Sequence, residues 1–151
     1  MEAMHIILTD DDADDRLFFK EAMDEIKIKT VVSFLNDGIQ LIDYLNKPGV
    51  RLPNVVFLDL NMPLKNGMEC LKEIRMNSHL NDLAVVIYST SSSEQDIEDA
   101  FVHGANIYIK KPNDFSELKS TLAQVITRNW QYHNLDLKKE NFLFSFNEHS
   151  K

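Results

Sequence analysis

Short apolar runs alternate with amphipathic stretches along this chain, and this alternation restricts the folds available to it. The runs are rich in Val, Ile, Phe and Tyr and occupy residues 5–8, 30–35, 54–60, 83–89 and 106–110. Runs of this length and near-continuous apolar character are typical of strands buried on both faces of a parallel sheet. After each run, apolar residues recur at three- and four-residue spacing, which indicates a helix packed by one face.

Local end signals agree with this pattern. Ser93 followed by Asp96 is typical of a helix N-cap, and Gly104 stands where the fourth helix should end. The sequence therefore predicts a (βα)₅ domain over residues 1–130. Because crossovers between parallel strands are right-handed, we expect an α/β, flavodoxin-like, doubly wound fold: a five-stranded parallel sheet of order 2-1-3-4-5 in three layers.

Composition restricts the partners. The 151 residues carry a net charge of −8, which disfavours binding to nucleic-acid phosphates or to anionic lipid surfaces. No apolar run approaches the ~20 residues that a membrane span requires. A single cysteine, Cys70, forms no internal disulfide and fits a reducing compartment. We therefore expect a cytoplasmic protein that binds neither nucleic acid nor membrane.

The sequence TDDDADD, residues 9–15, places five carboxylates directly after the first apolar run. Asp12 is expected to cap the following helix, and Asp14 and Asp15 to interact with its dipole. Asp10, Asp11 and Asp59 instead follow strands that are neighbours in the predicted order. Since ligands of open α/β sheets bind at the carboxyl ends of the strands, three converging carboxylates predict a site for a hard divalent cation.

Two further polar residues are predicted at the same edge of the sheet. Ser89 ends the fourth apolar run, and Lys111 follows the fifth, where Pro112 keeps it extended. Each residue alone would be an ordinary turn serine or surface lysine. Together with the acids they place complementary groups at the ends of four strands of one sheet.

These motifs resemble the receiver domain of the CheY-like response regulators of two-component signalling. The resemblance rests on IILTDDD, VVFLDLNMP, YST and GANIYIKKP, and it covers about residues 4–130. It implies that Asp59 is the phosphoacceptor and that Asp10 and Asp11 are the acid pair of the first strand. It also implies that Ser89 and Lys111 bind the phosphoryl group and that Tyr108 is the switch aromatic.

The resemblance implies a mechanism as well. Mg²⁺, or another divalent cation such as Mn²⁺, would be bound by Asp11, Asp59 and the backbone carbonyl of Asn61, with Asp10 acting through a water molecule. The phosphoryl donor would be a sensor histidine kinase or a histidine phosphotransfer protein. Movement of Ser89 toward the phosphoryl group would let Tyr108 turn inward. A downstream protein would then read the face formed by the fourth helix, fifth strand and fifth helix.

Alternatives from other classes are weaker. A phosphatase of the haloacid-dehalogenase class requires a second acid two residues after its nucleophile, where this chain has Asn61. An EF-hand loop starting at Asp10 requires a glycine where Asp15 stands. The better alternative is a receiver-like binding module that never takes up phosphate. We expect no enzyme activity beyond the chain's own phosphorylation and dephosphorylation.

Two features lie outside the shared pattern. Lys65 is a basic residue beside the predicted pocket and is interpreted as a modulator of access to it. Residues 131–151 form an extension of unknown role, in which Phe142, Phe144 and Phe146 alternate at strand-like spacing after Trp130 and Tyr132. This extension is predicted to pack on its own domain, or alternatively to exchange between two chains of a homodimer or to be disordered.

Overall fold

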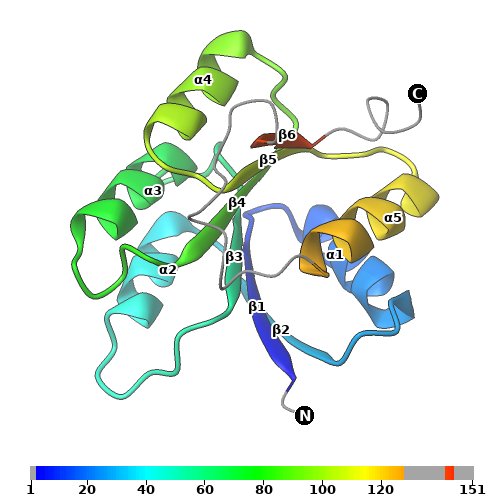
Figure 1. Cartoon of the computed structure of the whole chain (residues 1–151), viewed down its shortest axis with the longest axis horizontal. Helices are drawn as coiled ribbons and strands as arrows, with labels where there is room; N and C mark the ends of the chain where they lie inside the picture. Colours follow the sequence, from blue (N-terminus) through cyan, green and yellow to red (C-terminus); the bar gives the residue numbers. More distant parts are fainter. Residues whose placement is uncertain (1–2, 128–141, 145–151) are drawn as a thin grey trace.

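A computed structural model describes residues 3–127 and 142–144, which form one sheet between two layers of helices (Figure 1). The strands that follow the predicted runs are β1 Met4–Thr9, β2 Thr30–Leu35, β3 Val55–Leu58, β4 Ala84–Ser89 and β5 Ile107–Lys110. The helices between and after them are α1 Ala13–Glu25, α2 Gly38–Leu45, α3 Gly67–Met76, α4 Glu94–Val102 and α5 Phe115–Ile126. The predicted (βα)₅ succession is confirmed.

The strands pair in the order β2-β1-β3-β4-β5-β6, and every pairing is parallel. The predicted order 2-1-3-4-5 is therefore confirmed. The prediction of five strands needs one correction, because the two-residue strand β6, Leu143–Phe144, pairs with β5 and extends the sheet. Residues 142–144 thus pack on their own chain, as predicted, whereas Trp130, Tyr132 and Phe146 lie outside the described residues.

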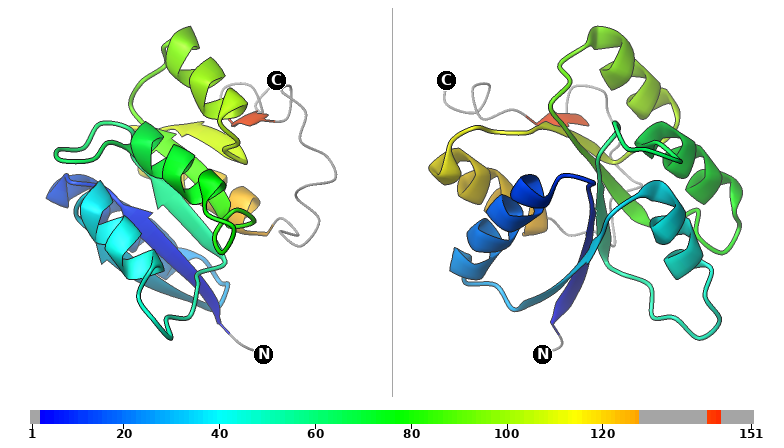
Figure 2. Two further views of the ribbon diagram at one scale, coloured as in Figure 1. Left: turned by 90° about the vertical axis from the view of Figure 1, so that its left-hand side faces the viewer. Right: turned by 180° about the vertical axis from the view of Figure 1, so that it is seen from behind.

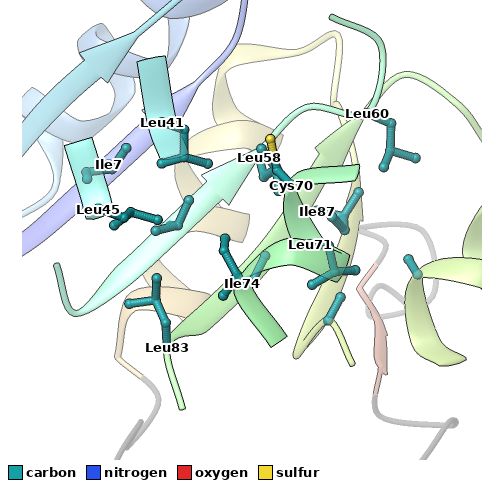
Figure 3. Packing of buried hydrophobic residues seen from close by; sticks show 14 of the residues in the cluster. Ile7, Leu41, Leu45, Leu58, Leu60, Cys70, Leu71, Ile74, Leu83 and Ile87 are labelled. Atoms are coloured by element: carbon teal, nitrogen blue, oxygen red, sulfur yellow. The ribbon is translucent and has the colours of Figure 1, made fainter. Parts of the chain in front are cut away.

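Helices cover both faces of the sheet, with α1 and α5 on one face and α2, α3 and α4 on the other (Figures 1 and 2). Because every central strand is covered twice, β3 and β4 are buried throughout. On the α2–α3–α4 face, aliphatic side chains from strands and helices interdigitate (Figure 3); those labelled include Ile7, Leu41, Leu58, Leu71, Ile74 and Ile87. On the opposite face, Phe19 packs edge to face against Phe57 and Tyr88.

Each helix begins at a capping side chain that accepts a hydrogen bond from a backbone N–H of the first turn. The caps are Asp12, Asp37, Asn66, Ser93 and Asp114. The predicted caps at residues 12 and 93 are therefore confirmed. The predicted end of the fourth helix is also confirmed, since Gly104 follows it with φ = 93°. No described helix combines the length and apolar character needed to cross a bilayer.

Gly67 brings the start of α3 against the end of β3. Its N–H donates to the carbonyl of Leu60 at 2.9 Å. A Cβ atom at this position would lie 2.1 Å from the carbonyl oxygen of Asp59, so a larger residue cannot occupy it without backbone movement. This close approach fixes the backbone that carries Asp59.

Candidate functional site

Three carboxylates meet where β1 and β3 end. Thr9 pairs with Leu58 in the parallel register, and the N–H of Asp59 donates to the carbonyl of Thr9 at 3.0 Å. Asp10 and Asp59 follow these strands directly, and one oxygen each of Asp10, Asp11 and Asp59 lies within 4.8 Å of the others. Asp10 and Asp59 are buried, whereas Asp11 is exposed. The convergence that the sequence predicted is present in the structure.

Lys111 supplies the positive charge of this group. Its Nζ donates to Oδ2 of Asp10 at 2.8 Å and lies 3.5 Å from Oδ2 of Asp59. The backbone N–H of Lys111 donates to the carbonyl of Ser89 at 2.8 Å, which fixes the chain at the end of β5. The ammonium also lies 5.3 Å from the centre of the Tyr88 ring. The lysine is thus inserted among the carboxylates rather than directed to solvent.

Asp15 is a member of the site that the sequence reasoning missed. Its Oδ2 accepts a second hydrogen bond from Lys111 Nζ at 2.8 Å, although we expected this residue only to interact with the helix dipole. The available signal was its position one helical turn after the N-cap Asp12, which directs it back over the carboxyl edge of the sheet. Asp14 has no bond to Lys111 among the described residues.

Burial controls the electrostatics of Asp59. Burial raises the pKa of the Asp59 carboxyl from 3.8 to about 6; the nearby Lys111 charge lowers it and the Asp10 charge raises it. Burial lowers the pKa of the Lys111 ammonium, but its hydrogen bonds to Asp10 and Asp15 outweigh this effect and raise the pKa overall. The lysine stays protonated at neutral pH and partly balances the buried carboxylates.

The carboxylates are oriented by the backbone around them. The N–H of Asp12 donates to Oδ1 of Asp10 at 3.0 Å, and the N–H of Asn61 lies 3.4 Å from Oδ1 of Asp59. No hydrogen bond to the Asp11 side chain is found within residues 3–127 and 142–144. An exposed carboxylate beside two oriented ones is a donor set that fits a hard divalent cation, which prefers oxygen ligands.

Ser89 and Tyr108 lie on adjacent strands, and both are completely buried. The Oγ of Ser89 accepts a hydrogen bond from the N–H of Ser91 at 3.1 Å. The hydroxyl of Tyr108 donates to the carbonyl of Ser91 at 2.8 Å, so the ring already points inward. Lys65, interpreted from sequence as a modulator of access, is paired with Glu73 of α3 instead of with the acidic group.

Comparison with known protein families identifies the family of this chain. Residues 6–123 match the family described as response regulator receiver domain. The chain belongs to this family. Its CheY-like character, expected from the motifs around Asp10, Asp59 and Lys111, is thereby confirmed.

Curated relatives agree with the receiver assignment. The chain is 31% identical over 123 residues to the probable methanogenesis regulatory protein FilR2 of Methanothrix harundinacea, covering 80% of this chain and 79% of that protein. It is 31% identical over 117 residues to response regulator Rcp1 of Synechocystis, covering 75% of this chain and 80% of that protein.

Solved receivers superpose on the same architecture. The phosphorylated cyanobacterial phytochrome response regulator RcpA is 30% identical, with a TM-score of 0.76 over 82% of this chain and 91% of that chain. The Mn²⁺-bound form of response regulator Rcp1 is 28% identical, with a TM-score of 0.73 over 81% of this chain and 91% of that chain.

Proposed function

We propose that this receiver is a phosphorylation-dependent signalling switch whose phosphoacceptor is Asp59. The observation that carries the proposal is the meeting of Asp10, Asp11 and Asp59 with the buried ammonium of Lys111. Asp59 presents a carboxylate at the sheet edge, the other acids supply cation ligands, and the lysine supplies a fixed positive charge. A single arrangement thus provides a nucleophile and the means to neutralise an incoming phosphoryl anion.

The proposed reaction is a phosphoryl transfer from a phosphohistidine. An oxygen of Asp59 bonds to phosphorus, the phosphorus–nitrogen bond of the donor breaks, and the imidazole leaves with the electron pair. Lys111 pairs with one phosphoryl oxygen, and the hydroxyl of Ser89 donates to another. A Mg²⁺ or Mn²⁺ ion held by Asp11, Asp59 and the carbonyl of Asn61, with Asp10 acting through water, would supply charge neutralisation in the transition state.

The proposed donor is a sensor histidine kinase or a histidine phosphotransfer protein in the cytoplasm. The proposed output is contact of a downstream protein with the face formed by α4, β5 and α5, where Tyr108 lies. Support comes from the phosphorylated RcpA and the Mn²⁺-bound Rcp1, which share the fold and about three tenths of the sequence. We propose residues 1–130 as the receiver unit and residues 131–151 as its extension.

The test is covalent labelling of the full chain. Incubation with acetyl phosphate and Mg²⁺ is expected to add one phosphoryl group that is labile to hydroxylamine, and Asp59→Asn is expected to abolish it. Asp37→Asn removes a carboxylate that caps α2 and is not among the three that meet at Asp59, and it serves as the matched control. Labelling of Asp59→Asn at full stoichiometry, or no labelling of the natural sequence, would favour the phosphorylation-independent binding module.

A further inference from the structure

The segment Phe142–Phe144 packs directly on the strand that carries Tyr108. Its strand β6 lies beside β5 (Figure 2) and continues the parallel ladder, in which Leu143 is opposite Tyr108 and Phe144 is opposite Ile109. Phe142 is 2% exposed; its ring centre lies 6.2 Å from that of Tyr108 and 5.3 Å from that of Phe101 in α4. The Tyr108 ring is therefore covered by the chain's own extension.

A hydrogen-bonded path joins this contact to the phosphoryl site. The Tyr108 hydroxyl donates to the carbonyl of Ser91 at 2.8 Å. The N–H of the same Ser91 donates to Oγ of Ser89 at 3.1 Å, and its hydroxyl donates to Oδ2 of Asp96 at 2.6 Å. The N–H of Ser93 also donates to Oγ of Ser91 at 3.2 Å, so Ser91 is held by four hydrogen bonds, one of them from the tyrosine that Phe142 covers.

The direction of these hydrogen bonds determines whether the Ser89 hydroxyl can donate its proton. A hydroxyl carries one proton and two lone pairs. Because the Ser91 N–H occupies one lone pair of Ser89, the proton of this buried hydroxyl is not used in that bond. It can turn either to the neighbouring Tyr108 hydroxyl, whose pKa a hydrogen bond from Ser89 lowers, or to a phosphoryl oxygen at the end of the adjacent strand. Burial raises the pKa of Tyr108 although hydrogen bonds to Ser91 and Ser89 lower it, so its hydroxyl stays a proton donor.

We propose that Phe142 is a positioning residue for the phosphoryl site and acts through Tyr108, Ser91 and Ser89. Docking of residues 142–144 fixes Tyr108 inward, and Tyr108 in turn holds Ser91 so that the Ser89 hydroxyl faces the phosphoryl group. This inference rests on the proposed function. Because coupling between two sites is reciprocal, a phosphoryl group on Asp59 also strengthens docking of the segment.

The contact that the structure shows is made within one chain. The Phe142 ring fills the space between α4 and β5, and β6 pairs with the edge of β5. The surface formed by α4 and the edge of β5 is thus occupied by Phe142 and the short strand β6 that follows it.

The test measures binding of beryllofluoride, a phosphoryl analogue, to the full chain in Mg²⁺. Phe142→Ala is expected to raise the dissociation constant about fivefold or more, the lower range of ordinary coupling between sites. Leu80→Ala is the matched control, because it also truncates a 2%-exposed core residue but lies in the loop before β4, at the other end of the sheet. An equal loss in Leu80→Ala would show general destabilisation and overturn the proposal.

A second variant isolates the path. Tyr108→Phe keeps the ring against Phe142 but removes the bond to Ser91, so adding Phe142→Ala to it is expected to change affinity no further. Independent, additive losses would contradict the proposed path. Amide hydrogen exchange of residues 143–144 is expected to slow when beryllofluoride binds, and unchanged exchange would contradict the reciprocal effect.

Failure of the two proposals can be told apart. If the natural sequence binds no beryllofluoride in Mg²⁺, the proposed function is wrong. If it binds and Phe142→Ala binds equally well, only the role of Phe142 is wrong. Light scattering of the liganded chain is expected to give the mass of a monomer; a doubled mass that Phe142→Ala abolishes would assign the segment to exchange between chains and overturn the intramolecular path.

Discussion

Asp15, in the first turn of α1, accepts a hydrogen bond from Nζ of Lys111 at 2.8 Å, across 96 residues of sequence. The same ammonium donates to Asp10 at 2.8 Å and lies 3.5 Å from Asp59. One cation is therefore shared by three anions. In the proposed function, a phosphoryl group on Asp59 would compete with Asp15 for Lys111.

Asp15→Asn is therefore expected to strengthen binding of beryllofluoride in Mg²⁺. The gain should be about threefold to tenfold, because removing one partly solvated unit charge changes the interaction by on the order of 1 kcal/mol. Asp14→Asn is the control, since it removes the same charge from the same turn but no hydrogen bond to Lys111. Titration of the natural sequence and both variants checks this, and equal gains in the two variants would show a nonspecific charge effect.

Lys111→Met is expected to destabilise the fold in metal-free buffer. It leaves the fully buried Asp10 and the buried Asp59 without their cation, and breaking such a buried pair costs about 3 kcal/mol. Lys110→Met, at the exposed neighbouring position, is expected to leave stability nearly unchanged. Urea unfolding of both variants measures the difference. Added Mg²⁺ should recover part of the deficit in Lys111→Met, and a deficit shared with Lys110→Met would count against the ion-pair explanation.

Asp59→Asn is expected to stabilise the metal-free chain in a pH-dependent way. Because burial raises the pKa of Asp59 to about 6, the folded state favours the neutral carboxyl. The stability that this group contributes is complete below pH 3.8 and is lost as the pH rises through about 6. At pH 7.5 the asparagine variant should therefore gain about 3 kcal/mol in the free energy of unfolding over the natural sequence, at about 1.4 kcal/mol per pKa unit.

Urea unfolding at pH 7.5 and at pH 4 measures this gain. The difference between the variant and the natural sequence should shrink toward zero at the lower pH. A gain of the same size at both pH values would mean that the effect comes from packing rather than from the charge of Asp59.

Gly67→Ala is expected to disturb Asp59 as well as the fold. The new Cβ would lie 2.1 Å from the carbonyl oxygen of Asp59, so β3 and α3 have to separate. We expect a loss of at least about 2 kcal/mol in stability and weaker Mg²⁺ binding. Gly49→Ala meets no atom within 4 Å but has φ = 77°, so it should cost only about 1 kcal/mol and leave Mg²⁺ affinity unchanged. Equal effects of the two substitutions on Mg²⁺ affinity would contradict the close-approach argument.

The strand order and the meeting of Asp10, Asp11 and Asp59 were predictable because two strong regularities act together. Buried parallel strands leave continuous apolar runs in the sequence, and right-handed crossovers bring their carboxyl ends to one edge. The bond from Lys111 to Asp15 was not predictable in the same way. Any acidic residue in the first helical turn interacts favourably with the helix dipole. Only the packing of α1 in the folded chain decides which of them reaches Lys111.

The contact of Phe142 with Tyr108 is a second feature that the sequence did not predict. The alternating Phe142 and Phe144 indicated a strand but not its partner, since a two-residue pairing leaves no register signal. Tyr108 was expected to turn inward only on activation, whereas its ring is fully buried against Phe142 in the structure. A contact between residues 34 positions apart depends on the path of the intervening chain, which local patterns do not encode.

The pairing of β6 with β5 has a consequence for how the protein behaves at high concentration. Strand β6 covers the β5 edge of the sheet. Among the described strands, β2 is the outer strand at the opposite edge. The strand TVVSFL carries no charge, and Val31 within it is 56% exposed. Uncharged outer strands are the ordinary starting points of aggregation. Solubility during concentration and storage should therefore depend on β2, and Val31→Lys is the substitution that would protect it.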